Sequence, residues 1–389
     1  MEQFTLTSNL IRRLARNNCF PIPENTLVFF GLRYVFPSDL RTCQDFQEGH
    51  EMISFEEAEM EERRFRKLSC TLGQWDTHNN TIAIFPGSTV PYLTDLQKHS
   101  DEQGRKNIAN MLMPGFFEYK HQLHNGDYPA FGLKKGKQPI RRSNLNTRFG
   151  FDEADDSIEV ADPGNNIHAS SCNAETKTHS GKSQYFSAGC QVIAGWGRSA
   201  YWKERITKFG PFDVFQKNAD KRSQQQSFWY MLLDGADAKR AATSQNNMPL
   251  AKLQFGSRDI SEKKLVTALQ QFLAKSGADV GQSGADGIFG GGTFKAIRNL
   301  QKAEGLPTNG IAIVQKAEDG GLDFKGLGTW KNGEIVEGSN RRPPQTRPAE
   351  EDNRVFSRPD ENNQESPQSE EDNRVFSRPD EDDREFSQP

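Results

Sequence analysis

Residues 260–313 contain two short amphipathic segments on either side of a glycine-rich turn. No other feature of the sequence limits the possible fold as strongly. Residues of helical spacing recur before the turn at positions 266, 269 and 273, and after it at 293, 296, 297 and 300. The turn itself consists of Asp286, Gly287, Ile288, Phe289 and Gly290, and its glycines permit the positive φ angles of a tight reversal. The pattern predicts a small all-α domain over residues 257–320.

With Leu269-Gln270, Leu300-Gln301 and Gly310 added, this segment resembles the three-helix peptidoglycan-binding domain found on many cell-wall enzymes. The resemblance covers nearly the whole length of that domain. It implies that Asp286, Gly287, Phe289 and Gly290 belong to a peptidoglycan-binding region, and that peptidoglycan is a partner of this protein. An unrelated helical hairpin is the alternative interpretation.

A cysteine with the surroundings of a nucleophile lies upstream, in the sequence Ser187, Ala188, Gly189 and Cys190. It follows Asn166, Ile167 and His168 by about twenty residues. Acyl transfer by cysteine needs a thiolate, and a nearby imidazole can accept the thiol proton. Glycine allows close backbone approach, so that N–H groups can face a developing oxyanion. A buried and inert cysteine is the alternative.

On these motifs, residues 75–200 resemble a diverged YkuD-type L,D-transpeptidase domain. The resemblance implies catalytic roles for Cys190 as nucleophile and His168 as general base, with Ser187 and Gly189 shaping the turn. This chain departs from the family pattern at Ala188, where His is usual, and at Val192, where Arg is usual. We expect Arg141, Arg142 or Arg148 to replace that arginine in gripping a substrate carboxylate, and Asn166 to contribute hydrogen bonds; ordinary surface charges and a simple turn are the alternatives.

The implied reaction needs no cofactor. His168 would take the Cys190 proton, and the thiolate would attack the carbonyl of the L-centred diamino acid in a tetrapeptide stem. The terminal D-residue would leave, and an amine or water would then resolve the thioester, giving transpeptidation or carboxypeptidation. His179 is a rival base. A zinc site of His168, Cys172, His179 and Cys190 is a further alternative, although the spacing matches no common zinc pattern.

The pattern of the remaining residues predicts a multi-domain α+β protein with a mainly β catalytic domain. Short strands with Gly and Pro between them are expected at residues 26–36, 81–85, 138–143 and 157–160, in a sandwich or a barrel-like sheet. Helices are expected within residues 1–20, 201–208 and 223–233. The predicted domains are an N-terminal segment of open role (1–70), the catalytic domain (71–235), a linker (236–256), the helical domain (257–320) and a disordered tail (341–389).

Charge and composition separate the tail from the rest. Residues 341–389 carry eight Arg and 14 Asp or Glu, a net charge of −6, whereas the whole chain has a net charge of −4. The sequence EEDNRVFSRPDE occurs at residues 350–361 and again at 370–381. Such polar, charged repeats predict disorder, or multivalent docking to a secretion adaptor or particle component. No broad basic surface favours nucleic-acid binding, and no apolar run is long enough for a membrane span.

The beginning of the sequence lacks the apolar core of a Sec-type signal. We therefore expect synthesis in the cytoplasm and action at the periplasm or cell wall after non-classical export. The five cysteines form an odd set, which leaves at least one thiol free. Three hypotheses remain open: an acyltransferase, a non-catalytic wall-binding or phage-like particle protein, and a toxin delivered into a neighbouring cell.

Overall fold

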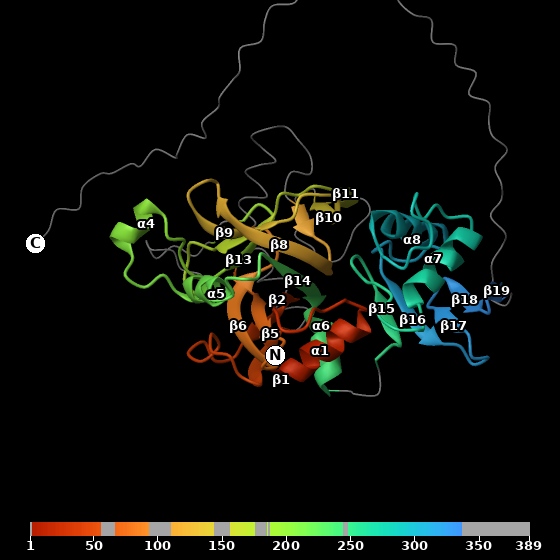
Figure 1. Cartoon of the computed structure of the whole chain (residues 1–389), viewed down its shortest axis with the longest axis horizontal. Helices are drawn as coiled ribbons and strands as arrows, with labels where there is room; N and C mark the ends of the chain where they lie inside the picture. The colour runs from red at the N-terminus through yellow and green to blue at the C-terminus, as the bar shows by residue number, and fades with distance from the viewer. Residues whose placement is uncertain are drawn as a thin grey trace, which may run out of the picture. The chain divides into compact units, whose positions relative to one another are not determined.

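Eight strands close into a barrel, which is the largest sheet of this structure (Figure 1). Their order is β12, β13, β6, β5, β2, β14, β8 and β9, and β9 pairs with β12 to close the ring. Only β12–β13 and β14–β2 are parallel pairs. The strands are β2 (Leu27–Arg33), β5 (Cys70–Asp76), β6 (Thr81–Ser88), β8 (Gly115–His124), β9 (Tyr128–Leu133), β12 (Asn166–Ala169), β13 (Gln191–Ile193) and β14 (Ser227–Asp234). Of the two predicted alternatives, a sandwich or a barrel-like sheet, the structure shows a closed barrel.

The computed structural model describes residues 2–55, 67–92, 110–143, 156–175, 185, 187–243 and 248–336. Within these ranges no helix is both long and apolar enough to cross a membrane. The predicted tail, with both of its repeats, lies outside the described residues, as do Arg148 and His179.

Aromatic side chains fill the barrel interior. Phe29 of β2 lies at its centre, with ring centroids 4.6 Å from Phe228 and 5.0 Å from Phe131. Helix α5 (Pro211–Asp220) contributes Phe215, whose ring lies 4.6 Å from that of Phe29. All four rings are fully buried. Burial of this kind stabilises a fold by roughly 1.5–3 kcal/mol per side chain, so this cluster fixes the barrel on which the candidate site is built.

The helix expected within residues 223–233 is wrong, because strand β14 occupies most of this segment. β14 pairs with β2 on one side and β8 on the other, and every residue from Tyr230 to Leu233 is buried. A strand buried on both faces needs no polar alternation. The apolar spacing of Phe228, Met231 and Leu232 therefore matched a helical period by coincidence, and the β-favouring aromatic run was the better signal.

The N-terminal segment, whose role the sequence left open, contributes directly to the barrel through β2. The remainder builds a second layer beside it, where β1 (Glu2–Thr7), β4 (Gly49–Ser54) and β3 (Val35–Pro37) form a three-stranded sheet. Helix α1 (Ser8–Asn17) confirms the predicted basic helix; Thr7 caps it, since its Oγ1 accepts from the Leu10 N–H at 3.0 Å. Tyr34, with φ of 61°, separates β2 from β3 within the strand predicted at residues 26–36.

The structure also contains a second small sheet, helix α4, and the elements of residues 236–256. The predicted strands at residues 138–143 and 157–160 are confirmed as β10 (Gln138–Ser143) and β11 (Asp156–Ala161), in a sheet with β7 (Asn110–Leu112). The helix predicted at residues 201–208 is confirmed as α4 (Ala200–Arg205). Residues 236–256, predicted as a linker, instead contain most of α6 (Gly235–Thr243) and all of β15 (Ala251–Leu253), and Ala238 and Ala241 of α6 pack in one buried cluster with Leu10 and Leu14 of α1.

The predicted helix pair in the C-terminal part is confirmed as α7 (Leu265–Lys275) and α8 (Gly291–Ala303). The region is not all-α, however. β15 begins a five-stranded antiparallel sheet that continues through β16 (Ala312–Lys316), β17 (Leu322–Phe324), β18 (Gly328–Lys331) and β19 (Glu334–Val336). Ala312, Val314 and Phe324 of this sheet are buried with Phe272 of α7 and Ile297 of α8. The helices need this sheet because one pair of helices leaves its apolar faces uncovered.

Candidate functional site

The turn that presents Cys190 is fixed by its own hydrogen bonds and by close contact with β7. The Ser187 hydroxyl donates to the Cys190 carbonyl at 2.8 Å and accepts from the Gly189 N–H at 3.3 Å. Gly189 adopts a φ of 154°, and a Cβ atom there would lie 2.5 Å from the Asn110 carbonyl oxygen. The Asn110 N–H donates to the Ala188 carbonyl at 3.2 Å. Only glycine fits at position 189, and Ser187 holds the loop rather than reaching outward.

Cys190 is the one cysteine of the five that is not fully buried as a residue. Its sulfur accepts a hydrogen bond from the Asn166 N–H, with an N–S distance of 3.4 Å. Burial of the thiol raises its pKa to about 11, although the Asn166 N–H bond acts in the opposite direction. The thiol is therefore protonated at neutral pH in the unliganded protein, and nucleophilic attack requires a proton acceptor.

His168 lies on β12, next to the strand that follows Cys190. Its Nδ1 lies 2.7 Å from the Ala169 carbonyl and 3.2 Å from the Tyr128 hydroxyl, so this nitrogen carries the proton and donates it. Nε2 is then an acceptor, and no residue in the described part of the chain donates a hydrogen bond to it. Burial and the neighbouring His124 lower the pKa of His168 to about 3, against a raising effect of the Ala169 bond. The ring is thus neutral at neutral pH, but the lowered pKa makes it a weak proton acceptor.

The described residues contain no hydrogen bond between the His168 ring and the Cys190 sulfur. Instead, the two are connected through Asn166, which precedes His168 by two positions and bonds the sulfur through its backbone. The Asn166 side chain donates to His124 Nδ1 at 3.2 Å and accepts a short hydrogen bond from Gln122. The predicted substrate-binding residue Asn166 therefore uses both its amide atoms within the protein.

Sequence reasoning missed His124 and Tyr128. The His124 ring stacks on the His168 ring with centroids 3.9 Å apart, and burial lowers the pKa of His124 as well, against a raising effect of Asp127. Both residues flank the turn between β8 and β9, where Asn125 and Gly126 have positive φ angles of 49° and 73°. An Asn-Gly pair between two strands predicts a hairpin with such a turn. What the sequence could not show is that β9 pairs with β12, which brings His168 beside this hairpin.

The arginines predicted to bind a carboxylate lie on β10. Arg142 pairs with Glu159 of β11, with Nε 2.6 Å from the carboxylate oxygen, and Arg141 is 3% exposed. β10 pairs with β7 through Arg141 and Met111, and β7 contacts the Gly189 turn through Asn110. The two arginines are therefore one strand away from the cysteine turn, and Arg142 already has an anionic partner.

The four residues predicted in the peptidoglycan-binding region support the turn between α7 and α8. Asp286 Oδ1 accepts from Gln270 Nε2 at 2.9 Å and from the Ile288 N–H at 2.9 Å, while the Gly287 N–H donates to Gln270 Oε1 at 2.8 Å. Phe289 is fully buried, and Gly290 is the N-cap of α8. Ile288, between them, is 41% exposed. The side chains of this turn thus shape the domain, and Ile288 is its outward-facing apolar group.

Gln301 repeats the arrangement of Gln270 one helix later. Its Nε2 donates to Asn309 Oδ1 at 3.0 Å and to the Ile311 carbonyl at 2.9 Å, and its Oε1 accepts from the Gly310 N–H at 2.9 Å. Each buried glutamine therefore holds a three-residue turn of an Asx residue, Gly and Ile. This internal symmetry explains why Leu-Gln occurs in both helices.

The described residues give no support to the alternative of a zinc site. Cys172 is buried, and its sulfur lies 3.1 Å from the Ser170 hydroxyl. Among the residues that the structure describes, no three His, Cys, Asp or Glu side chains gather in a way that would hold a metal ion.

Comparison with known proteins bears on the C-terminal part. The family described as putative peptidoglycan binding domain matches residues 262–312, which contain α7, α8 and the turn between them. No curated protein and no solved structure matches the chain. The resemblance of residues 260–313 to a peptidoglycan-binding domain is thus supported. The resemblance of residues 75–200 to L,D-transpeptidases receives no support from these comparisons.

Proposed function

We propose that this protein associates with peptidoglycan through residues 262–312 and modifies its stem peptides through a thioester on Cys190. The observation that carries the catalytic part is the placement of Cys190. As a residue it is the least buried of the five cysteines although its thiol is covered, it lies on a turn that only glycine at position 189 permits, and His168, stacked on His124, belongs to the strand that pairs with β13. A turn fixed in this way holds a nucleophile in position before the substrate arrives.

In the proposed reaction, the Cys190 sulfur forms a bond to the carbonyl carbon of the L-centred diamino acid, and the amide bond to the terminal D-residue breaks. The thiol proton passes to a neutral imidazole, with His168 Nε2 as the acceptor, and from there to the leaving amine. An acceptor amine or water then cleaves the thioester and restores the thiol. Because burial raises the Cys190 pKa, proton transfer accompanies the attack rather than preceding it.

A second candidate function is peptidoglycan binding without catalysis. Two observations favour it: the raised pKa of the Cys190 thiol, and the binding of His168 Nδ1 to Ala169 and Tyr128 with no hydrogen bond to the sulfur in the described structure. Both candidates place the site of action at the cell wall. The catalytic candidate also allows the protein to act as an effector that is delivered into a neighbouring cell.

Incubation of the full chain with muropeptides, followed by mass spectrometry of the products, tests the proposal. We expect loss of a terminal residue or formation of a cross-link with the unmodified protein and with Cys172→Ala, and neither product with Cys190→Ala. Cys172 is a suitable control because it is a buried cysteine near the same strands. Intact muropeptides together with retained binding to sacculi would support the non-catalytic candidate.

A further inference from the structure

A pocket of about 350 Å³ opens at the end of the barrel remote from Cys190, beside the turn between β5 and β6. Asp76, Asn79, Asn218, Arg222 and Phe46 line it, together with Thr81 and Lys221. β6 runs from Thr81 at this pocket to Ser88, which pairs with Val192 near the cysteine turn. At a rise of about 3.3 Å per residue, the two ends of β6 are roughly 23 Å apart. The pocket is thus a separate site.

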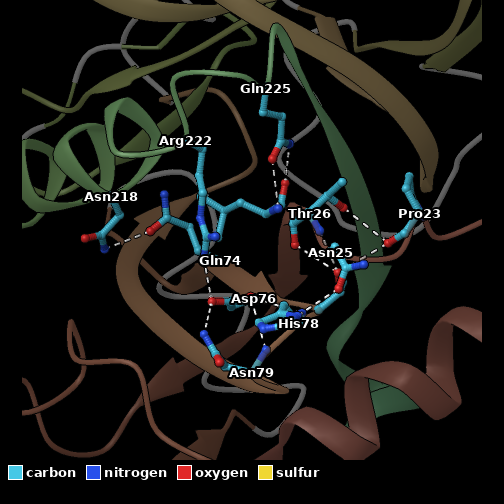
Figure 2. A network of polar contacts seen from close by, with 12 residues as sticks. Pro23, Asn25, Thr26, Gln74, Asp76, His78, Asn79, Asn218, Arg222 and Gln225 are labelled. Carbon is cyan, nitrogen blue, oxygen red and sulfur yellow. Dashed lines mark hydrogen bonds and ion pairs between the residues drawn. The ribbon is translucent and has the colours of Figure 1, made fainter.

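Hydrogen bonds hold the polar side chains of this pocket in place from behind (Figure 2). Asn79 Nδ2 donates to Asp76 Oδ2 at 2.8 Å, and Asn218 Nδ2 donates to Gln74 Oε1 at 3.0 Å. Arg222 donates a short hydrogen bond from one terminal nitrogen to the same Asp76 oxygen. Gln74 is itself fixed, because its Nε2 donates to the Phe215 carbonyl at 2.7 Å.

Asn79, Asn218 and Arg222 each keep a second polar atom for another partner. Within the described part of the chain, Asn79 Oδ1 and Asn218 Oδ1 accept no hydrogen bond, and Arg222 has two nitrogens left after its bond to Asp76. The pocket thus offers two oriented amide acceptors and a guanidinium donor. Their rotamers are already fixed, which lowers the entropy cost of binding.

An aromatic ring and a cationic side chain also line this pocket. Phe46 is 36% exposed, which is unusual for a phenylalanine, and it lines the same pocket as the two asparagines. Lys221 is exposed and forms no ion pair with any described residue. A ligand that matches all these groups has hydroxyl or acetamido groups at its edge, an apolar C–H face, and a nearby carboxylate.

We propose that this pocket binds a saccharide of the N-acetylhexosamine class, with its ring face on Phe46 and its polar edge on Asn79, Asn218 and Arg222. Lys221 then favours sugars that carry a carboxylate. This inference does not depend on nucleophilic chemistry at Cys190. A few convergent polar groups beside an apolar surface are the usual composition of a small-molecule site.

Isothermal titration of the full chain with two probes tests the proposal: an uncharged tetramer of N-acetylglucosamine, and a disaccharide that contains N-acetylmuramic acid. We expect saturable binding of both. Phe46→Ala and Asn218→Ala should each weaken both by about tenfold or more, as loss of an anchoring side chain does. Lys221→Ala should weaken only the carboxylated probe.

Tyr201→Ala is the matched control, because Tyr201 is an exposed aromatic residue of α4 that does not line the pocket. It should leave both affinities unchanged. Thermal unfolding of each variant separates lost binding from lost folding, and Lys221→Ala changes only an exposed side chain. The proposal would be overturned if the unmodified protein showed no saturable binding. It would also be overturned if Phe46→Ala and Asn218→Ala bound the probes with the affinity of the unmodified protein. Muropeptide turnover at Cys190 is unaffected by either result, so the two proposals fail separately.

Discussion

Replacing Asp76 with Ala should destabilise the barrel, and the structure sets the size of the effect. Asp76 is 4% exposed and accepts from Arg222, from the Asn79 side chain, and from the backbone N–H groups of His78 and Asn79. These contacts tie the segment that follows α5 to the turn between β5 and β6 (Figure 2). The His78 and Asn79 N–H groups sit on an exposed turn and can bond water instead. The main loss is therefore the Arg222 pair.

The Arg222 side chain is 35% exposed, so water recovers part of its solvation once the partner is removed. Breaking a fully buried pair costs about 3–5 kcal/mol, and a charged hydrogen bond contributes about 1.5–3 kcal/mol. We expect a loss of about 2–3 kcal/mol for Asp76→Ala at neutral pH. Urea unfolding measures it as a shift in the midpoint without a change in slope.

The pH dependence of that difference is a sharper test. Burial alone would raise the Asp76 pKa, but hydrogen bonds from Asn79 and His78 and the Arg222 charge lower it overall. A lowered pKa in the folded state means that the stabilisation is present above the unfolded value, about 3.9, and is lost as the pH falls through the folded value. The gap between the unmodified protein and Asp76→Ala should therefore narrow in acid. A gap below about 0.5 kcal/mol at pH 7, the range of ordinary surface changes, would refute the reasoning.

Three other outcomes follow from the site and the C-terminal region. Gly189→Ala should abolish turnover, because its Cβ atom would lie 2.5 Å from the Asn110 carbonyl oxygen. Gly277→Ala is the control, because φ is positive there too but a Cβ atom would meet nothing within 4 Å, and normal turnover in Gly189→Ala would contradict the account. Gln270→Ala should lower the free energy of unfolding of the C-terminal region by about 2–3 kcal/mol, because several buried groups lose their hydrogen-bond partner. Urea unfolding measures this loss, and sacculus binding measures its effect on function. The control is Gln271→Ala, since Gln271 is the exposed neighbour. Alkylation of Cys190 should accelerate about tenfold per pH unit above neutrality, because the raised pKa keeps the thiolate fraction small until about pH 11; a rate already constant at pH 7 would show a thiolate in the resting protein.

Local patterns predicted the elements whose signal lies within one segment. The spacing of apolar residues around the Asp286 turn predicted α7 and α8, and the strand-like residues at 81–85 and 138–143 predicted β6 and β10. These signals succeed because helix and strand periods are properties of neighbouring residues. The segment containing β14 failed the same test, since burial on both faces removes the alternation that marks a strand.

Long-range pairing was the part that the sequence could not predict. The proximity of His124 and Tyr128 to His168 depends on β9 pairing with β12. In this pairing Asn166 lies opposite Gly132 and Ile167 opposite Phe131, residues that are 34 and 36 positions apart in the sequence. The same applies to the ion pair between Arg222, which follows α5, and Asp76 of β5. Residues far apart in the chain carry no local sign of such contacts, so the second imidazole and the Asp76 pocket emerged only from the fold.

The most direct test of the central claim is the intact mass of the protein during incubation with a tetrapeptide muropeptide, followed by peptide mapping. The account predicts an adduct equal to the muropeptide without its terminal residue, mapped to Cys190, released by hydroxylamine and absent in Cys190→Ala. An unmodified Cys190 under conditions in which the protein remains bound to the muropeptide would contradict the claim.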